Sequence, residues 1–199
     1  MNTPLIIGIT GGIGSGKTTL SRSLREAGYE VYDSDLEARR LQNENPEIRK
    51  GLMELFGTDI YTQEGLNRPK LAEIVFSDQS LLLKLNAIVH PVIRLDFENW
   101  VMQRQQLKFV FVESAIMIES GFSKLVNKII LVTAAEQLRI ERVIKRDGIT
   151  EEQVKARMSK QYPDDVKIPL ADYVMYTDDN LPMVDKMEKA LDWLLQTIN

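Results

Sequence analysis

A short glycine-rich segment near the start of the chain carries the residue types that bind polyphosphates. Gly11, four further residues, and then Gly16, Lys17 and Thr18 satisfy the phosphate-loop pattern. Glycines let the backbone wrap closely around phosphate groups with its N–H groups pointing inward. Lys17 would neutralise the β- and γ-phosphates of a nucleotide, and the Thr18 hydroxyl would ligate Mg²⁺. The pattern therefore predicts nucleotide binding; a glycine-rich turn that matches by chance is the alternative.

The residues on either side of this loop match the strand and helix that a phosphate loop joins. Leu5–Ile9 is a short apolar run suited to a buried strand, and Thr18–Leu24 opens a helical pattern. The amino terminus of such a helix adds partial positive charge to the site. We expect Lys17 to face solvent at the mouth of the loop. The predicted nucleotide-binding residues are Gly11, Gly12, Ile13, Gly14, Ser15, Gly16, Lys17, Thr18 and Thr19.

Two carboxylates follow the second predicted strand. Asp33 and Asp35 flank Ser34 directly after Tyr29–Tyr32, and ligands of open α/β sheets bind beyond the carboxyl ends of the strands. In an extended chain the two carboxylates point the same way. One would then accept a proton from a substrate hydroxyl, while the other orients the substrate or approaches a metal. Alternatively, Ser34 or Asp35 caps a helix that starts near Leu36, with Asp33 still free to act as the base.

Three arginines are spaced to lie on one helical face. Arg139, Arg142 and Arg146 follow one another at intervals of three and four residues. Kinases of small molecules use a mobile lid whose arginines neutralise the transferring phosphoryl group. The alternative is a solvated helix face on which Glu141 and Lys145 pair. Together with a phosphate loop, the spacing favours the lid.

The chain has a single histidine, His90, followed by Pro91. A proline often starts a helix, and the residue before it is pushed out of helical geometry. We therefore expect a helix boundary at His90. A lone histidine does not make a metal site, and either a structural turn or a ligand contact would account for it.

The composition limits what kind of protein this is. The 199 residues suffice for one domain, and 44% of them are hydrophobic, as is usual for a globular protein. A net charge of −4 argues against nucleic-acid binding. The absence of cysteine excludes disulfides and thiolate catalysis. The first residues lack the basic segment of a signal peptide, and no run approaches a membrane span. We expect a cytoplasmic protein that binds no membrane.

The order of predicted elements indicates the fold. Alternating strands and helices imply an α/β protein with a five-stranded parallel sheet flanked by helices. We expect one phosphate-loop kinase domain over residues 1–199, with a helical substrate-binding subdomain at about 58–107 and a lid at about 139–168. The predicted strands are Leu5–Ile9, Tyr29–Tyr32, Phe109–Val112, Ile129–Val132 and Tyr173–Tyr176.

One class of phosphate-loop protein is excluded by a missing motif. GTPases read guanine with Asn-Lys-x-Asp, whereas Asn127 and Lys128 are followed here by Ile129 and Ile130. The small size and the inserted helices favour a kinase that acts on a small molecule.

With these features assembled, the chain resembles the dephospho-CoA kinase family. The likeness runs nearly end to end, and the Asn-x-x-x-His-Pro element is its most specific part. The matching segments are Thr10–Thr19, Asp33–Asp35 with Ala38-Arg39, Leu85–Pro91, Arg142–Asp147 followed by Arg157 and Gln161, and Ala171–Val174.

The resemblance implies transfer of the γ-phosphate of ATP to the ribose 3′-hydroxyl of dephospho-CoA, with Mg²⁺ as cofactor. It implies Asp33 as the base, with Lys17 and Arg142 acting on the transferring group. Arg142 and Arg146 would bind ATP. Thr18 would bind the metal directly and Glu113 through water. The acceptor-binding residues would be Asp33, Asp35, Arg39, His90 and Glu119.

The chain departs from the family in three places. Glu113 stands where the family usually has aspartate, in a segment that also lacks the usual proline. Met175–Asp179 differs from the usual Asp-Asn pair after the last strand, and Arg139 stands where a different polar residue is common. Another small-molecule kinase, or an ATP-dependent switch without enzymatic activity, remains as an alternative. We expect a monomer or weak homo-oligomer.

Overall fold

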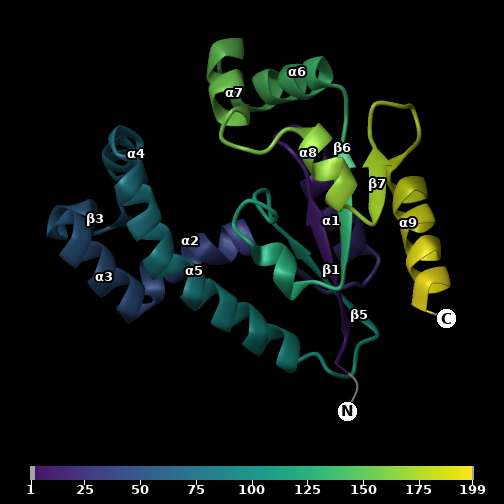
Figure 1. Ribbon diagram of the computed structural model, residues 1–199, viewed down its shortest axis with the longest axis horizontal. Coiled ribbons are helices and arrows are strands. Elements are labelled where there is room, and N and C mark those ends of the chain that lie inside the picture. The colour runs from purple at the N-terminus through teal and green to yellow at the C-terminus, as the bar shows by residue number, and fades with distance from the viewer. Residues whose placement is uncertain (1–2, 199) are drawn as a thin grey trace. The chain divides into compact units, whose positions relative to one another are not determined.

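The computed structural model describes residues 3–198, apart from the side chains at positions 76, 77, 79 and 198. The chain forms two compact units (Figure 1). The first comprises the described parts of Met1–Asp33 and Arg104–Asn199, and the second is Ser34–Gln103. Among the described residues, none of the helices is long and apolar enough to cross a membrane.

A five-stranded parallel sheet organises the first unit, as the sequence predicts. Its strand order is β2-β5-β1-β6-β7. The strands β1, β5 and β6 are almost entirely buried, because the middle of a parallel sheet is covered on both faces. The bounds are β1 Leu5–Thr10, β2 Val31–Asp33, β5 Phe109–Glu113, β6 Lys128–Thr133 and β7 Tyr173–Tyr176.

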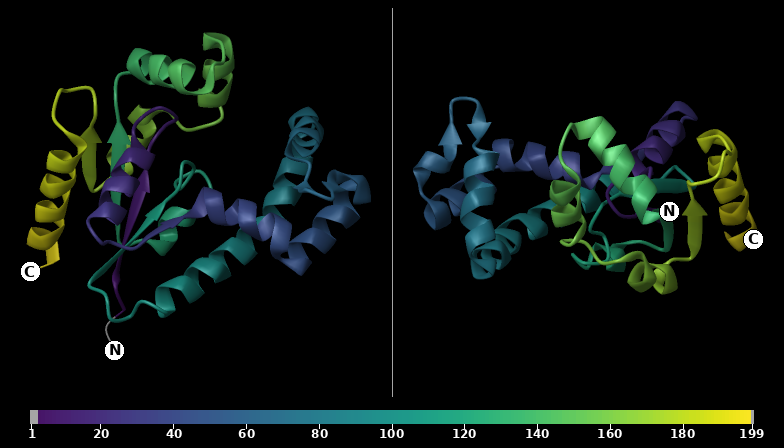
Figure 2. Two further views of the ribbon diagram at one scale, coloured as in Figure 1. Left: turned by 180° about the vertical axis from the view of Figure 1, so that it is seen from behind. Right: turned by 90° about the horizontal axis from the view of Figure 1, so that it is seen from above.

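Helices cover this sheet and extend past its carboxyl edge. Helices α1 and α9 pack against each other on one face, where Leu20 and Leu24 of α1 and Leu194 of α9 join the core. Helices α6 and α7 lie beyond the end of β6 (Figures 1 and 2). The helices of this unit are α1 Lys17–Glu26, α6 Glu136–Asp147, α7 Glu151–Met158, α8 Asp164–Lys167 and α9 Met183–Ile198, with 3-10 turns η2 Phe122–Leu125 and η3 Ile168–Leu170.

The α6–α7 excursion has a small core of its own. Ile140 and Val143 of α6 pack with Val154 of α7, and Ile13 of the phosphate loop packs against this cluster. Thr150 and Gln153 form a reciprocal capping box that starts α7. The excursion matches the segment that the sequence assigns to a lid, while its closing motion stays a prediction.

The second unit is helical with a short hairpin. It begins at Ser34, so α2 and α3 belong to it, whereas the sequence places the start of the helical subdomain near residue 58. The hairpin of β3 and β4 was not predicted, because each strand has only two residues. The elements are α2 Ser34–Glu44, α3 Pro46–Phe56, η1 Thr58–Ile60, β3 Tyr61–Thr62, β4 Gly65–Leu66, α4 Arg68–Ser77 and α5 Gln79–Met102.

The predicted helix boundary at His90 is wrong. Helix α5 runs through Pro91 without interruption. Pro91 removes one helical N–H, yet buried Val89, Ile93 and Phe97 lie at intervals of four residues on both sides of it. The continuous apolar face stabilises the helix across the proline.

Candidate active site

The phosphate loop joins β1 to α1 in a conformation that requires glycine. Gly11 and Gly14 have φ angles of 149° and 80°, which side-chain-bearing residues rarely adopt. A Cβ on Gly11 would lie 2.0 Å from the Val132 carbonyl oxygen, and one on Gly14 would lie 2.5 Å from the Arg139 carbonyl oxygen. The strand β6 and the helix α6 therefore approach the loop too closely for any other residue.

The amino terminus of α1 offers an anion site. Its N-cap residue is Gly16, which has no side chain to cap the first N–H groups. Uncapped N–H groups and the helix dipole together favour a phosphate at this position. The geometry thus agrees with the nucleotide-binding prediction.

The Lys17 side chain is buried rather than solvent-facing, so that expectation is wrong. Only 8% of Lys17 is exposed, and its Nζ donates to the Gly12 carbonyl oxygen at 3.3 Å. An ammonium group needs hydrogen-bond acceptors wherever it lies, and the loop supplies one of its own carbonyls. A bound phosphate would therefore compete with Gly12 for the Lys17 amine.

Asp33 and Glu113 are neighbours at the carboxyl edge of the sheet. They are register partners at the ends of β2 and β5, and Glu113 is also aligned with Ile9 of β1, one residue before Thr10. The Thr18 hydroxyl donates to Glu113 Oε1 at 2.9 Å. Glu113 is 6% exposed, and its Oε2 is buried without a hydrogen-bond partner. This edge therefore gathers two carboxylates and a hydroxyl beside the phosphate loop.

The residues at this edge fit a magnesium ion. Mg²⁺ prefers oxygen ligands and is usually held by one or two carboxylates together with substrate phosphates. The Thr18 hydroxyl and the unpartnered Glu113 Oε2 supply such donors. The Glu113 side chain reaches the Thr18 hydroxyl directly, so glutamate at this position keeps a carboxylate beside the phosphate loop.

Asp35 does not continue the extended chain that the sequence argument assumed. Helix α2 begins at Ser34, so both Ser34 and Asp35 are already helical. The backbone turns directly after Asp33, and the alternation of side chains along a strand no longer relates the two carboxylates. Asp33 alone is thus aligned with Glu113.

Arg142 links the phosphate loop to the segment after β7. Its Nη1 donates to the Thr177 hydroxyl at 2.9 Å and to the Gly14 carbonyl oxygen at 3.3 Å, and its Nη2 donates to the Thr177 carbonyl oxygen at 2.6 Å. The Thr177 hydroxyl in turn donates to the Ser15 carbonyl oxygen at 2.8 Å. The Arg142 guanidinium therefore joins the phosphate loop to the segment after β7, both of which border the predicted nucleotide site.

Comparison with known proteins decides the family. A model of the dephospho-CoA kinase family matches residues 5–182. This chain belongs to the dephospho-CoA kinase family. A relative named dephospho-CoA kinase from Bacteroides fragilis strain YCH46 is 36% identical over 193 residues, covering 97% of this chain and 94% of the relative.

Solved structures agree with this fold. A crystal structure from Thermus thermophilus matches with a TM-score of 0.86 at 35% identity over all of both chains. The dephospho-CoA kinase from Campylobacter jejuni matches with a TM-score of 0.72 over all of both chains, at 24% identity. The predicted fold class is thereby confirmed as that of the phosphate-loop kinases.

Arg146, the last of the three predicted lid arginines, shares an acidic partner with Arg157. Arg146 is exposed and its Nε donates to Asp147 Oδ1 at 2.7 Å, while Arg157 Nη1 donates to Asp147 Oδ2 at 2.9 Å. The Arg146 guanidinium, followed by that of Arg157, lowers the pKa of the Asp147 carboxyl. Asp147 therefore holds two arginines together in the predicted lid.

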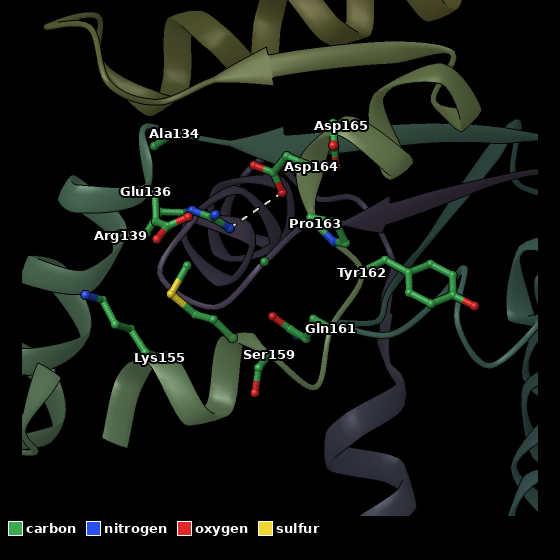
Figure 3. A pocket seen from close by; sticks show the side chains of 12 residues that line it. Ala134, Glu136, Arg139, Lys155, Ser159, Gln161, Tyr162, Pro163, Asp164 and Asp165 are labelled. Carbon is green, nitrogen blue, oxygen red and sulfur yellow. Dashed lines mark ion pairs between the residues drawn. The ribbon is translucent and has the colours of Figure 1, made fainter. Parts of the chain in front are cut away.

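Arg139 is buried against the phosphate loop. It is 7% exposed, and its Nη1 lies 3.5 Å from Asp164 Oδ1. The guanidinium reaches so near Gly12 that a Cβ there would lie 2.0 Å from Nη1. Arg139, Gly12 and Asp164 line a pocket of about 550 Å³ between the loop, α6, α7 and the segment before α8 (Figure 3). Nothing in the sequence signalled Asp164 as the partner, because 25 residues separate the pair.

Glu119 belongs to a buried cluster of the first unit. Its Oε1 accepts from the Tyr162 backbone N–H at 2.8 Å and lies 2.9 Å from the Nζ of Lys167, which is fully buried. The ion pair lacks hydrogen-bond geometry at Lys167 Nζ, so charge rather than a directed bond holds the two side chains. The predicted contact of Glu119 with the acceptor stays a prediction.

Arg39 and His90 lie in the second unit. Arg39 is exposed on α2, and its carbonyl oxygen accepts from Arg68 Nη2 at 3.2 Å. His90 is half-buried on α5, and burial lowers its pKa below the ordinary value. The neutral imidazole is therefore favoured. Their predicted contacts with the acceptor stay predictions.

Asp172, from the Ala-Asp-x-Val motif of the family, contacts the amino-terminal end of β6, at the opposite end of the parallel strands from the phosphate loop. Its Oδ2 accepts from the Ile129 backbone N–H at 2.8 Å, and its Oδ1 pairs with Lys128 Nζ at 2.9 Å. Both contacts are at the start of β6, whereas the phosphate loop follows the end of β1. This motif residue is therefore structural.

Proposed function

We propose that this chain transfers the γ-phosphate of ATP to the ribose 3′-hydroxyl of dephospho-CoA, giving CoA and ADP in the last step of coenzyme A synthesis. Membership of the dephospho-CoA kinase family supports the reaction. The observation that carries it is the alignment of Asp33 with Glu113 at the sheet edge beside the phosphate loop. This alignment supports Asp33 as the base beside Glu113 as a metal-binding carboxylate, the arrangement that phosphoryl transfer needs.

In this proposal ATP binds along Gly11–Thr19. The loop N–H groups and the Lys17 amine hold the β- and γ-phosphates and neutralise the charge that spreads over the transferring group. Lys17 leaves the Gly12 carbonyl to do so. Arg142 and Arg146 bind ATP from the α6 side.

Asp33 accepts the proton of the attacking ribose hydroxyl. In a loose phosphoryl transition state the alcohol need not be ionised early, so the proton moves to Asp33 late. On the family resemblance, the proposed acceptor-binding residues are Asp33, Asp35, Arg39, His90 and Glu119.

Thr18 and Glu113 would hold Mg²⁺, the hydroxyl directly and the carboxylate through water. When bound, the ion neutralises phosphate charge and fixes the phosphate geometry. The role of these two residues is to present oxygen donors at a fixed place, which their mutual hydrogen bond ensures.

Replacing Glu113 by glutamine is expected to raise the Mg²⁺ concentration needed for half-maximal activity about tenfold or more. The amide keeps the length of the side chain but removes the charge, and losses of that kind around metal sites cost roughly 10–100-fold in affinity. Titration of activity with Mg²⁺ at saturating ATP measures the effect. Glu141→Gln, an exposed change on α6, serves as control. An unchanged Mg²⁺ midpoint would show that Glu113 is not part of the metal site.

Replacing Arg142 by alanine is expected to raise KM for ATP by about 10- to 100-fold, with a smaller effect on kcat. Its guanidinium hydrogen bonds join the loop to Thr177, and bonds to a charged group contribute about 1.5–3 kcal/mol. Steady-state kinetics at varied ATP separates this from the arginine-finger role expected from the sequence. A loss confined to kcat, by about 10³-fold, would restore that role.

The proposed setting is the cytoplasm, with the chain acting as a monomer or weak homo-oligomer on small molecules and without nucleic acid. The net charge of −4 supports the absence of nucleic acid. Size-exclusion chromatography with light scattering tests the oligomeric state.

ADP release measured against a panel of acceptors tests the proposed function. Dephospho-CoA should be the preferred acceptor over AMP, shikimate and gluconate. Faster turnover of AMP, shikimate or gluconate would contradict the proposed acceptor and indicate a kinase that acts on another small molecule. Slow ADP release that ignores the acceptor would indicate an ATP-dependent switch.

A further inference from the structure

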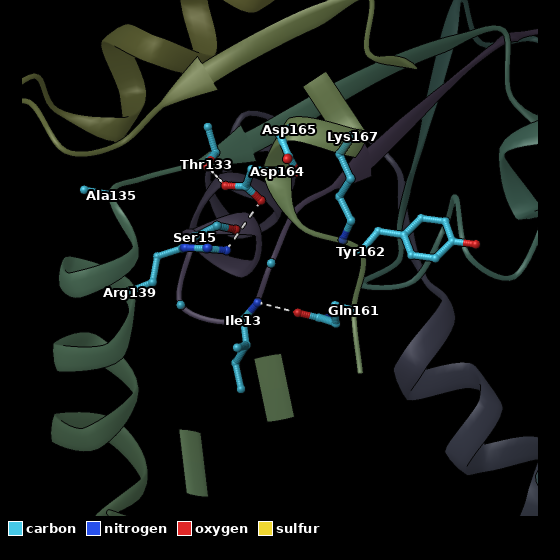
Figure 4. Close-up of polar contacts among 12 residues, drawn as sticks. Ile13, Ser15, Thr133, Ala135, Arg139, Gln161, Tyr162, Asp164, Asp165 and Lys167 are labelled. Carbon is cyan, nitrogen blue, oxygen red and sulfur yellow. Dashed lines mark hydrogen bonds and ion pairs between the residues drawn. The ribbon is translucent and has the colours of Figure 1, made fainter. Parts of the chain in front are cut away.

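Gln161 connects the phosphate loop to the segment after β5. Its side-chain Oε1 accepts from the Ile13 backbone N–H at 2.9 Å (Figure 4), and its Nε2 donates to the Ala115 carbonyl oxygen at 3.4 Å. Ala115 is two residues past Glu113. One side chain, located between α7 and α8, thus bridges two parts of the candidate active site that are about a hundred residues apart in the chain.

The bond to Ile13 fixes the orientation of one peptide group. The Ile13 N–H and the Gly12 carbonyl belong to the same trans peptide and therefore point in opposite directions. While Gln161 holds the N–H, the carbonyl faces the other way and accepts from Lys17 Nζ at 3.3 Å and from the Ser15 N–H at 3.2 Å. A rotation of this peptide would break its bond to Gln161 and its bond to the Lys17 amine together.

Neighbouring contacts hold Gln161 in place. The next residue, Tyr162, donates its backbone N–H to Glu119, whose carboxylate is neutralised by buried Lys167. In the same region the Arg139 guanidinium lies against Gly12. The Gln161 backbone is thus anchored through a buried ion pair, so its side chain starts from a fixed point.

We propose that Gln161 is a positioning residue for phosphate binding: it sets the Gly12–Ile13 peptide and, through the Gly12 carbonyl, the resting place of the Lys17 amine. The inference deepens the proposed function, since it concerns the same nucleotide site. It does not depend on the identity of the acceptor. Loss of the Gln161 hydrogen bonds should weaken nucleotide binding while the acceptor interaction is kept.

Calorimetric titration with ADP tests the proposal on the full chain, with Gln161→Met as the main variant. Methionine has a similar length but makes no comparable hydrogen bond. We expect the Kd for ADP to rise about five- to tenfold, the size of one lost hydrogen bond, with the melting temperature and the KM for dephospho-CoA nearly unchanged. Gln137→Met, on the exposed face of α6, should leave all three quantities unaltered.

Gln161→Asn keeps the amide on a shorter side chain and provides a second test if the methionine variant folds poorly. It should also weaken ADP binding, because it cannot reach both Ile13 and Ala115. Wild-type affinity for ADP in either folded variant would overturn the proposal. So would an equal loss of ADP affinity, acceptor affinity and melting temperature in both, since that pattern marks a general structural role. ADP binding needs no acceptor, so a failure with dephospho-CoA alone would count against the proposed function and not against this inference.

Discussion

Replacing Lys17 by alanine is expected to remove nearly all phosphoryl transfer, lowering kcat by about 10³-fold or more, while the chain remains folded. In the proposed mechanism the Lys17 amine is the positive charge beside the transferring group, and such preorganised charge contributes several kcal/mol to the transition state. The Gly12 carbonyl keeps its bond from the Ser15 N–H when Lys17 is lost. The loop therefore retains one of the contacts that shape it.

Single-turnover kinetics measure the loss of phosphoryl transfer, and a thermal melt measures whether the Lys17→Ala variant remains folded. Lys189→Ala, the same substitution on the exposed side of α9, is the matched control and should change neither. An active Lys17→Ala enzyme would show that the glycine-rich segment does not bind the reacting phosphates.

Replacing Asp33 by asparagine is expected to lower kcat by about 10²–10⁴-fold, the usual loss when a general base is removed. Asparagine preserves the size of the side chain and still hydrogen-bonds, but it cannot accept the proton of the ribose hydroxyl. The affinity for ADP should barely change, because Asp33 ends β2 and is not part of the phosphate loop.

Asp35→Asn is the matched comparison for this base. Asp35 lies within the first turn of α2, where a carboxylate interacts favourably with the helix dipole, and its loss should cost about 0.3–1 kcal/mol of stability. Its effect on kcat should be far smaller than that of Asp33→Asn. A larger loss of kcat for Asp35→Asn would show that Asp33 is not the base.

The sheet and the phosphate loop were predictable because local sequence determines them. The strands β1, β5 and β6 each contain an uninterrupted apolar run, which marks central parallel strands. Gly11 and Gly14 occupy backbone conformations that their residue type permits and others do not. The continuity of α5 was not predictable from Pro91, since packing of its apolar face outweighs the local cost of the proline.

The partners of the site residues were not predictable, because they come from distant parts of the chain. Gln161 meets Ile13 across 148 positions, and Thr18 meets Glu113 across 95. Spacing along one helix placed Arg139 and Arg142 on a common face, yet only the fold shows that Arg139 is buried beside Asp164. A pattern identifies which residue types have the right chemistry, and long-range packing decides which of them meet.

The identity of the phosphorylated product tests the central claim most directly. The protein is incubated with ATP, Mg²⁺ and dephospho-CoA, and the product is analysed by mass spectrometry and phosphorus NMR. We predict a single added phosphate on the ribose 3′-hydroxyl, with one ADP formed for each CoA. Unmodified dephospho-CoA, or a phosphate at another position, would contradict the proposed function.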